Sequence, residues 1–228
     1  MNFTDALAAA LHLLATRDPH VVAAVIVSLE VALLATLFAT LLGAPLGFLV
    51  GAGRFRARRA VEVALNTATA LPTVVVGLLV YTLLSRRGPL GGLELLYTRG
   101  AMVIGETLLV TPLMAALTMA LVSGADPRIR ETALTLGATR LGAARAVLSE
   151  LRRGALAAVA TGFGRLISEL GVALMVGGNI ESSTRTMTTA IALETGKGEF
   201  ALALALGVIL LGVALLVNVS AAAVTGSR

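Results

Sequence analysis

Arg165 and Glu169 are the residues best suited to chemistry inside an apolar part of this chain. Residues four apart share one face of a helix, so the two side chains are predicted to form an ion pair, with Ser168 beside it. An unpaired charge at the centre of a bilayer costs about 3 kcal/mol. Two interpretations stay open: the three side chains line or gate a path across the membrane, or the pair only stabilises a helix contact. Glu30 and Glu106, the other ionisable groups inside apolar runs, either bond to polar neighbours or serve the same path.

Catalytic chemistry is not expected. The chain has no cysteine, and its imidazoles, His12 and His20, lie near the N-terminus, so neither a metal site nor a cofactor is predicted. The stretch "ETGKGEF" differs from a phosphate-binding loop, because Gly198 stands where Ser or Thr is required and Ile191 where the first glycine should be. In "GFGRLI", Ile167 replaces the third glycine of a dinucleotide fingerprint. Any nucleotide-derived energy must therefore come from a partner protein.

The elements that position these residues are predicted to be membrane-spanning helices. The chain is 57% hydrophobic and 14% charged, with a mean hydropathy of +0.92. Long apolar runs without strict alternation favour α-helices over barrel strands. The sequence therefore predicts an all-α, polytopic membrane protein with about five transmembrane helices in a single domain, residues 1–228, and its net charge of +5 reflects topology and not nucleic-acid binding. The spans are expected near residues 21–53, 60–84, 101–123, 155–178 and 201–224, with a polar loop at 124–153.

The first apolar run is longer than one membrane crossing requires. It must tilt, break or protrude, and Pro45 is the expected place for a kink. Gly43, Gly47 and Gly51 repeat a small residue every four positions, a spacing typical of close helix contacts. Such a stripe packs against another helix of the same subunit or forms the seam of a homodimer. Before this run, residues 2–15 are predicted to form a short amphipathic helix at the membrane surface.

Arginines are concentrated in alternate connections. With five spans, the first and third connections lie on one side, and a surplus of Lys and Arg marks the cytoplasmic side. This distribution predicts an external N-terminus and a cytoplasmic C-terminus. The richer side holds Arg54, Arg56, Arg58, Arg59, Arg128, Arg130, Arg140, Arg145, Arg152 and Arg153; the poorer side holds Arg17, Arg86, Arg87, Arg99, Arg185 and Lys197.

The polar loop at 124–153 has the signals of two short helices. Asp126 and Pro127 predict a capped helix start. Gly137 predicts a stop in the left-handed conformation, and Thr139 predicts the cap of a second helix that ends near Leu151. The hairpin also carries apolar residues, so it either presses on another protein or only joins two spans.

The stretch "ETALTLGA" resembles the signature loop of permease subunits of bacterial ATP-binding-cassette (ABC) importers. In that family the loop carries a coupling helix that docks on separate ATPase subunits. Thr132 stands where the family has its first Ala, and "VLSE" replaces an expected Ile-x-Leu-Pro. Because this proline is missing, the second helix of the loop is expected to run directly into the fourth span. The resemblance implies ATPase coupling through Glu131, Thr132, Ala133, Gly137, Ala138, Arg140, Leu141 and Arg145.

Other blocks narrow the resemblance to oxyanion permeases of the type I importer fold. "LPTVVVGLLVYTLLSRRGPLG", "GFGRLISELGVALMVGGNI" and "TRTMTTAIALETGKGEF" are most similar to the tungstate branch, with molybdate and sulfate permeases as alternatives. The resemblance implies a homodimer in the bacterial inner membrane, working with ATPase subunits and an extracytoplasmic oxyanion-binding protein. Arg86, Arg87, Asn179 and Arg185 are expected at the outer mouth, where they attract the anion, contact the binding protein or end a helix.

Two other classes of function would require features that differ from those of an ABC permease. An ion-driven transporter or channel that needs no ATPase would be expected to show several midplane carboxylates or internal repeats, and no convincing repeat is found. A membrane enzyme would need a nucleophile, a base or a metal site, and no such constellation is recognised.

Overall fold

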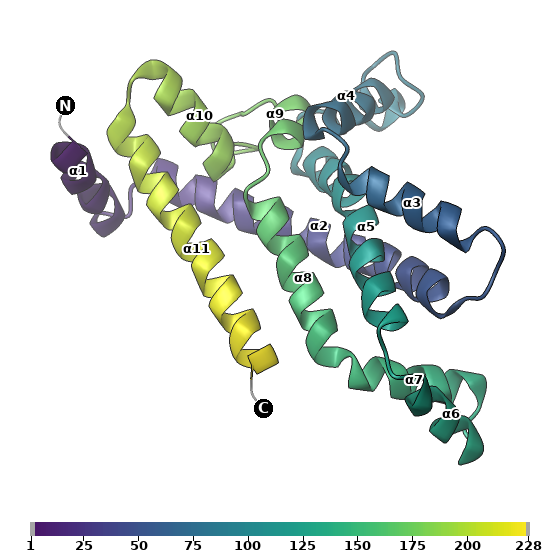
Figure 1. The fold of residues 1–228 in the computed structure, drawn as a ribbon. Coiled ribbons are helices and arrows are strands. Elements are labelled where there is room, and N and C mark those ends of the chain that lie inside the picture. Colours follow the sequence, from purple (N-terminus) through teal and green to yellow (C-terminus); the bar gives the residue numbers. More distant parts are fainter. Residues whose placement is uncertain (1–2, 227–228) are drawn as a thin grey trace.

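The computed structural model describes residues 3–226, without the side chains of Pro127, Arg130 and several positions within 3–14 and 221–226. Within that range the chain is helical, without strands, which confirms the all-α prediction. In Figure 1 the helices of residues 99–123, 152–167 and 200–226 run side by side, and the longest helix, residues 19–52, crosses behind them. In chain order they are α1 (Phe3–Ala15), α2 (Pro19–Ala52), α3 (Arg58–Thr69), α4 (Thr73–Leu84), the short 3₁₀ helix η1 (Gly91–Leu93), α5 (Arg99–Ser123), α6 (Pro127–Thr135), α7 (Arg140–Glu150), α8 (Arg152–Ile167), α9 (Gly171–Gly177), α10 (Met187–Lys197) and α11 (Phe200–Gly226).

The first apolar run forms one unbroken helix. α2 continues through Pro45 for 34 residues, a length of about 50 Å at about 1.5 Å per residue, so it must tilt or protrude and does not break. Its start is capped by Asp18, whose carboxylate accepts the backbone N–H of His20 at 2.9 Å. The helix predicted before it is present as α1, residues 3–15, while residue 2 lies outside the described residues and the place of this helix at the membrane surface stays a prediction.

The glycine stripe of α2 packs against α5 of the same chain. A Cβ on Gly43 would lie 2.6 Å from the backbone oxygen of Thr111, and one on Gly47 would lie 2.2 Å from that of Ala115. No side chain fits at such distances, so the two backbones touch. Of the two interpretations of this stripe, packing within one subunit is the correct one.

Two of the expected spans are broken. The run 60–84 is divided into α3 and α4, which meet at 93°, and the run 155–178 is divided into α8 and α9, which meet at 57°. Pro72 explains the first break, because it lacks an N–H and disfavours helical geometry at the residue before it. In the described residues, three helices are each long and apolar enough to cross a membrane, and five spans result if each bent pair counts as one.

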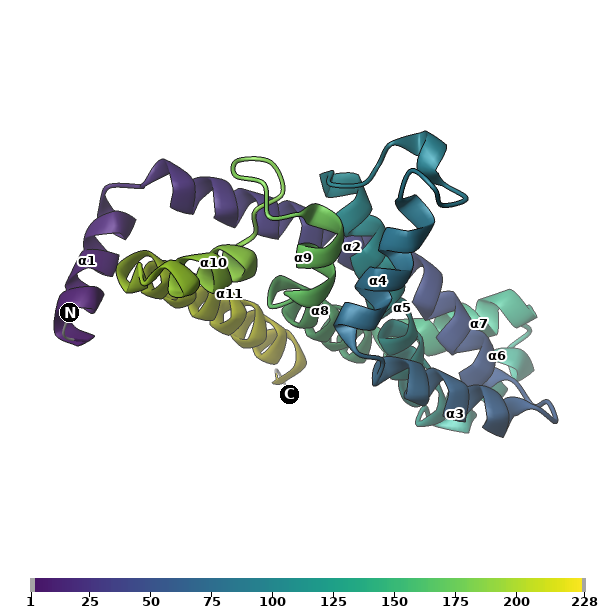
Figure 2. The ribbon, with the colours of Figure 1, turned by 90° about the horizontal axis from the view of Figure 1, so that it is seen from above.

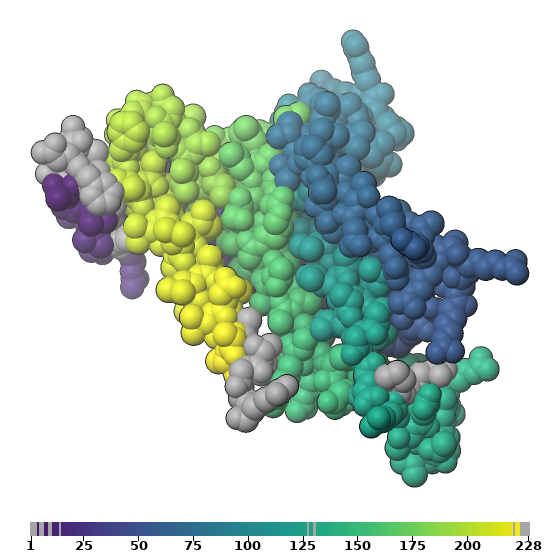
Figure 3. Space-filling view, viewed as in Figure 1, coloured from purple at the N-terminus to yellow at the C-terminus, as the bar shows by residue number. Residues whose placement is uncertain are grey.

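The arginine-rich connections lie at one end of the bundle. Arg58 donates to the hydroxyl of Ser123 at 2.9 Å, which joins the start of α3 to the end of α5. At the opposite end, Tyr97 N–H donates to the carbonyl of Val176 at 2.9 Å, which joins the α4–α5 connection to α9. The hairpin of α6 and α7 projects from the arginine-rich end, and this projection forms the lower edge of the molecule in Figure 3.

α11 lies along one flank of the bundle and packs on α1, α10 and α8. Figure 2, from above, shows α1 beside the start of α11 and the α3–α4 pair at the far side of the molecule. The core between these flanks is built from small and branched side chains and methionines, among them Ala35, Met102, Val110, Val172 and Met187.

Candidate functional site

The α6–α7 hairpin is held by the local signals that the sequence predicted. The Asp126 carboxylate accepts the N–H of Arg128 at 2.9 Å, and the Thr139 hydroxyl accepts the N–H of Gly142 at 3.1 Å. Gly137 takes a left-handed φ of +86°, and α6 ends in the two reversed hydrogen bonds of a Schellman motif, from Ala138 to Ala133 and from Gly137 to Leu134. Only Leu151 separates α7 from α8.

The hairpin presents an exposed surface that mixes apolar and charged groups. Leu136 is 82% exposed and Leu141 is 63% exposed, although both are leucines in an ordered, capped element. Ala143 and Val147 on the inner face of α7 are buried. Of the residues expected to couple to an ATPase, Glu131, Thr132, Gly137, Arg140, Leu141 and Arg145 are exposed, and Ala133 and Ala138 are half-buried.

The predicted ion pair forms at the break between α8 and α9. Arg165 Nη1 lies 2.6 Å from Glu169 Oε2, and Glu169 Oε1 accepts the backbone N–H of Gly171 at 2.8 Å. The Glu169 side chain is only 2% exposed, whereas that of Arg165 is 41% exposed. Ser168 ends α8, and its hydroxyl donates to the carbonyl of Gly164 at 3.1 Å. The carboxylate is therefore fully engaged, while the guanidinium keeps an open side.

This open side faces a cleft of about 420 Å³ between α4 and the α8–α9 break. The fixed charges on its wall are one guanidinium and one carboxylate, so the wall has little net charge. A dianion could make transient contacts with Arg165 and Ser168 there, but nothing provides the convergent cations of a tight site. The wall is formed by Thr73, Val74, Arg165, Ser168, Glu169, Leu170, Gly171, Leu174 and Met175.

Two further carboxyl groups, one half-buried and one fully buried, have different surroundings. Glu30 pairs with Arg99 at 2.5 Å, and Arg99 also donates to the carbonyl of Ser183 at 2.8 Å, so this pair joins α2, α5 and the α9–α10 connection. Glu106 is 2% exposed, and one of its oxygens lacks a partner within the described part of the chain. Both glutamates were expected inside apolar runs, but residue spacing could not identify Arg99, 69 positions from Glu30, as a partner.

The four residues expected at the outer mouth divide into two sets. Arg185 Nε donates to Asn179 Oδ1 at 3.3 Å, and its guanidinium lies 3.5 Å from the Glu181 carboxylate, which also pairs with His20. Arg185 is therefore held by neighbouring side chains, and its action on an anion at the outer mouth stays a prediction. Arg86 and Arg87 are exposed in the connection after α4. Sequence reasoning missed Glu181, although its spacing of four from Arg185 signalled the pair.

Solved structures with the same architecture identify the fold. One chain of a bacterial ABC transporter involved in the import of the acidic polysaccharide alginate has a TM-score of 0.76 with this chain at 18% identity, covering 99% of this chain and 83% of that one. A structure of a bacterial alginate ABC transporter in complex with an alginate-bound periplasmic protein gives 0.73 at 19% identity, covering 90% of this chain and 78% of that one. The fold is that of a type I ABC importer permease.

The family follows from the sequence itself. The model of the binding-protein-dependent transport system inner membrane component matches residues 43–226, and the chain belongs to that family. It is thus a polytopic membrane permease subunit, as predicted.

Curated relatives match most of this chain. The tungstate uptake system permease protein TupB of Peptoclostridium acidaminophilum is 39% identical over 92% of both chains. The TupB protein of Campylobacter jejuni is 40% identical over 72% of this chain and 69% of that one. The sulfate transport system permease protein CysT of Salmonella typhimurium is 29% identical over 87% of this chain and 74% of that one.

Proposed function

We propose that this chain is the permease subunit of an ATP-driven importer for tungstate. Tungstate is supported as the substrate by sequence identities of 39% and 40% to two TupB proteins, compared with 29% to a sulfate permease. Molybdate and sulfate are the alternatives within the same chemical class. The observation that carries the mechanism is the capped α6–α7 hairpin with exposed Leu136 and Leu141.

The hairpin is the docking element for a separate ATPase subunit. Its leucines supply apolar contact area, while Glu131, Arg140 and Arg145 supply charge around them. The exposed apolar side chains of this projection gain contacts when a partner protein covers them. The projection lies at the arginine-rich end, so that end is cytoplasmic and the N-terminus is external.

The translocation path runs along the cleft beside the α8–α9 break and is completed by a second copy of the chain. Apolar residues that line this cleft are exposed: Val74 by 56% and Leu174 by 46%. The weak polar wall allows passage and release, because a deep fixed anion site would slow transport. Arg165, Ser168 and Glu169 then line or gate the path, and selectivity belongs to an extracytoplasmic oxyanion-binding protein that docks at the outer mouth near Arg86 and Arg87.

Reconstitution tests these proposals. The chain is placed in proteoliposomes with its ATPase, the binding protein and internal ATP, and tungstate uptake is measured in competition with molybdate and sulfate. We expect ATP-dependent uptake that tungstate saturates first. Uptake by the chain alone, without ATPase or ATP, would instead establish an ion-driven transporter or channel.

Docking is tested separately with the purified ATPase subunit. Glu131→Lys on the hairpin is compared with Glu94→Lys in the connection at the opposite end, and both variants reverse one exposed charge. Binding should weaken for the hairpin variant only. Equal binding of both variants and the native chain would reject the docking role.

A further inference from the structure

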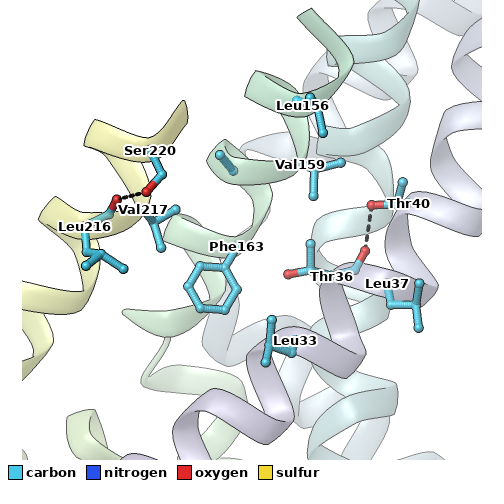
Figure 4. A pocket seen from close by; sticks show the side chains of 11 residues that line it. Leu33, Thr36, Leu37, Thr40, Leu156, Val159, Phe163, Leu216, Val217 and Ser220 are labelled. Atoms are coloured by element: carbon cyan, nitrogen blue, oxygen red, sulfur yellow. Dashed lines mark hydrogen bonds between the residues drawn. The ribbon is translucent and has the colours of Figure 1, made fainter. Parts of the chain in front are cut away.

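A second, larger groove lies between α2, α8 and α11 and has no role in the proposed path. Its volume is about 610 Å³. Figure 4 shows Phe163 of α8 at its centre, with side chains of α2 and α11 facing it from two sides. The residues that line it are Leu33, Thr36, Leu37, Thr40, Leu156, Val159, Ala160, Phe163, Leu216, Val217 and Ser220.

The wall of this groove has no hydrogen-bond donor left for a polar ligand. The hydroxyl of Thr36 donates to the carbonyl of Ala32 at 2.6 Å, that of Thr40 to the carbonyl of Thr36 at 2.7 Å, and that of Ser220 to the carbonyl of Leu216 at 2.7 Å. None of the residues on the wall carries a charge. A hydrated oxyanion would lose its water there without compensation, so the occupant must be apolar.

On α8 the groove is lined from Leu156 to Phe163, and the same face of the helix carries a cation, Arg152, about one turn before the groove begins. Arg152, Leu156, Val159 and Phe163 follow one another at helical spacing, so they share one face of α8. From Arg152 to Phe163 this face is about 16 Å long, at about 1.5 Å per residue, and half of a hydrocarbon core is about 15 Å. Arg152 is exposed and belongs to the arginine-rich end, where phosphate groups of a membrane lie.

We propose that this groove binds an anionic phospholipid, with an acyl chain against Phe163 and the phosphate on Arg152. Basic residues at the membrane surface attract anionic headgroups, and basic pockets between transmembrane helices bind them. The apolar wall between α8 and α11 supplies the site for the chain. The inference does not depend on which anion the protein transports.

Lipid binding is measured on the delipidated full-length chain in detergent, by native mass spectrometry with phosphatidylglycerol and phosphatidylcholine of identical acyl chains. We expect the anionic lipid to bind about tenfold more tightly. Arg152→Gln should remove this preference, while Arg56→Gln, an exposed arginine of another connection at the same end, should keep it. Ala160→Phe should weaken both lipids at least tenfold by filling the groove. Ala155→Phe is the control, because Ala155 is exposed on α8 and does not line the groove.

A second measurement needs no variant that fills the groove with a side chain. The chain contains no tryptophan, so Phe163→Trp introduces a single tryptophan, whose fluorescence is excited selectively at long wavelength and is quenched on contact by brominated phosphatidylglycerol. The matched variant is Phe38→Trp, at an α2 position that is 45% exposed and outside the groove. The fluorescence of Phe163→Trp should be quenched when one or two lipids are bound per chain. The fluorescence of Phe38→Trp should be quenched only when lipid has replaced most of the detergent around the protein.

Three outcomes would overturn the proposal: equal affinity of Ala160→Phe and the native chain for lipid, equal quenching of the two tryptophan variants, or an Arg152→Gln variant that keeps the preference for the anionic lipid. If Ala160→Phe leaves lipid binding unchanged and dissociates a dimer, the groove is an interface between two copies and the lipid assignment is wrong.

Discussion

Truncation of Leu136 gives the sharpest prediction about the hairpin. This side chain is 82% exposed in the isolated chain, so an ATPase that covers it can bury nearly all of its apolar surface. Full burial of a leucine side chain contributes about 1.5–3 kcal/mol. Leu136→Ala should therefore lose about 2 kcal/mol of binding free energy, which corresponds to about a 30-fold weaker Kd at about 1.4 kcal/mol per factor of ten.

The assay is calorimetric titration of the purified ATPase subunit into the permease in detergent. Leu211→Ala is the matched control, since Leu211 is 71% exposed on α11 and lies away from the hairpin. The loss for Leu136→Ala should appear without a change in thermal unfolding, because so exposed a side chain contributes little to the fold. Affinities for Leu136→Ala and Leu211→Ala within a factor of two of each other would refute the reasoning.

Three further predictions concern the bundle, the α8–α9 break and the hairpin turn. Gly47→Ala places a Cβ 2.2 Å from a backbone oxygen of α5 and should destabilise the protein by about 1–3 kcal/mol; Gly212→Ala, with nothing within 4 Å, should be neutral or stabilising in the same thermal unfolding assay. Glu169→Gln leaves the Arg165 guanidinium without its counter-charge, so the maximal uptake rate should fall while the folded yield is kept; a lower melting temperature with normal uptake per folded molecule would indicate a structural pair. Gly137→Ala should destabilise the hairpin by about 1–2 kcal/mol, because alanine disfavours the φ of +86° at this position. ATPase binding should weaken in the titration, while tungstate binding by the delivery protein should be unchanged.

The features that sequence reasoning predicted correctly are those fixed by neighbours along the chain. The caps at Asp126 and Thr139 and the turn at Gly137 depend on contacts over two to five residues, which spacing reveals. The Arg165–Glu169 pair also joins near neighbours along the chain, although Glu169 lies beyond the end of α8 and the pair forms at the break instead of within a continuous helix. None of these four features requires a partner far away in the sequence.

The features that could not be predicted from the sequence are changes of chain direction and contacts between residues that lie far apart in the chain. A hydropathy run shows that residues 60–84 are apolar but not that they bend by 93°, although Pro72 was the available signal. The glycine spacing of α2 identified a contact face without naming α5, because periodicity contains no information about the partner. The Glu30–Arg99 pair joins residues 69 positions apart, and only the packing of α2 on α5 brings them together.

Under the proposed function, α8 is the shortest mechanical route from the ATPase contact to the translocation path. A single residue separates its start from α7, and it ends at Ile167, next to the Arg165–Glu169 pair. Its 16 residues span about 24 Å, and a helix of this length transmits displacement because its backbone hydrogen bonds resist stretching. The break that follows prevents the same displacement from passing straight into α9. Glu169 holds the start of α9 through the N–H groups of Gly171 and Val172, so movement of α8 acts first on the geometry of this ion pair. The charged group nearest the path thus lies where motion from the hairpin is converted into bending.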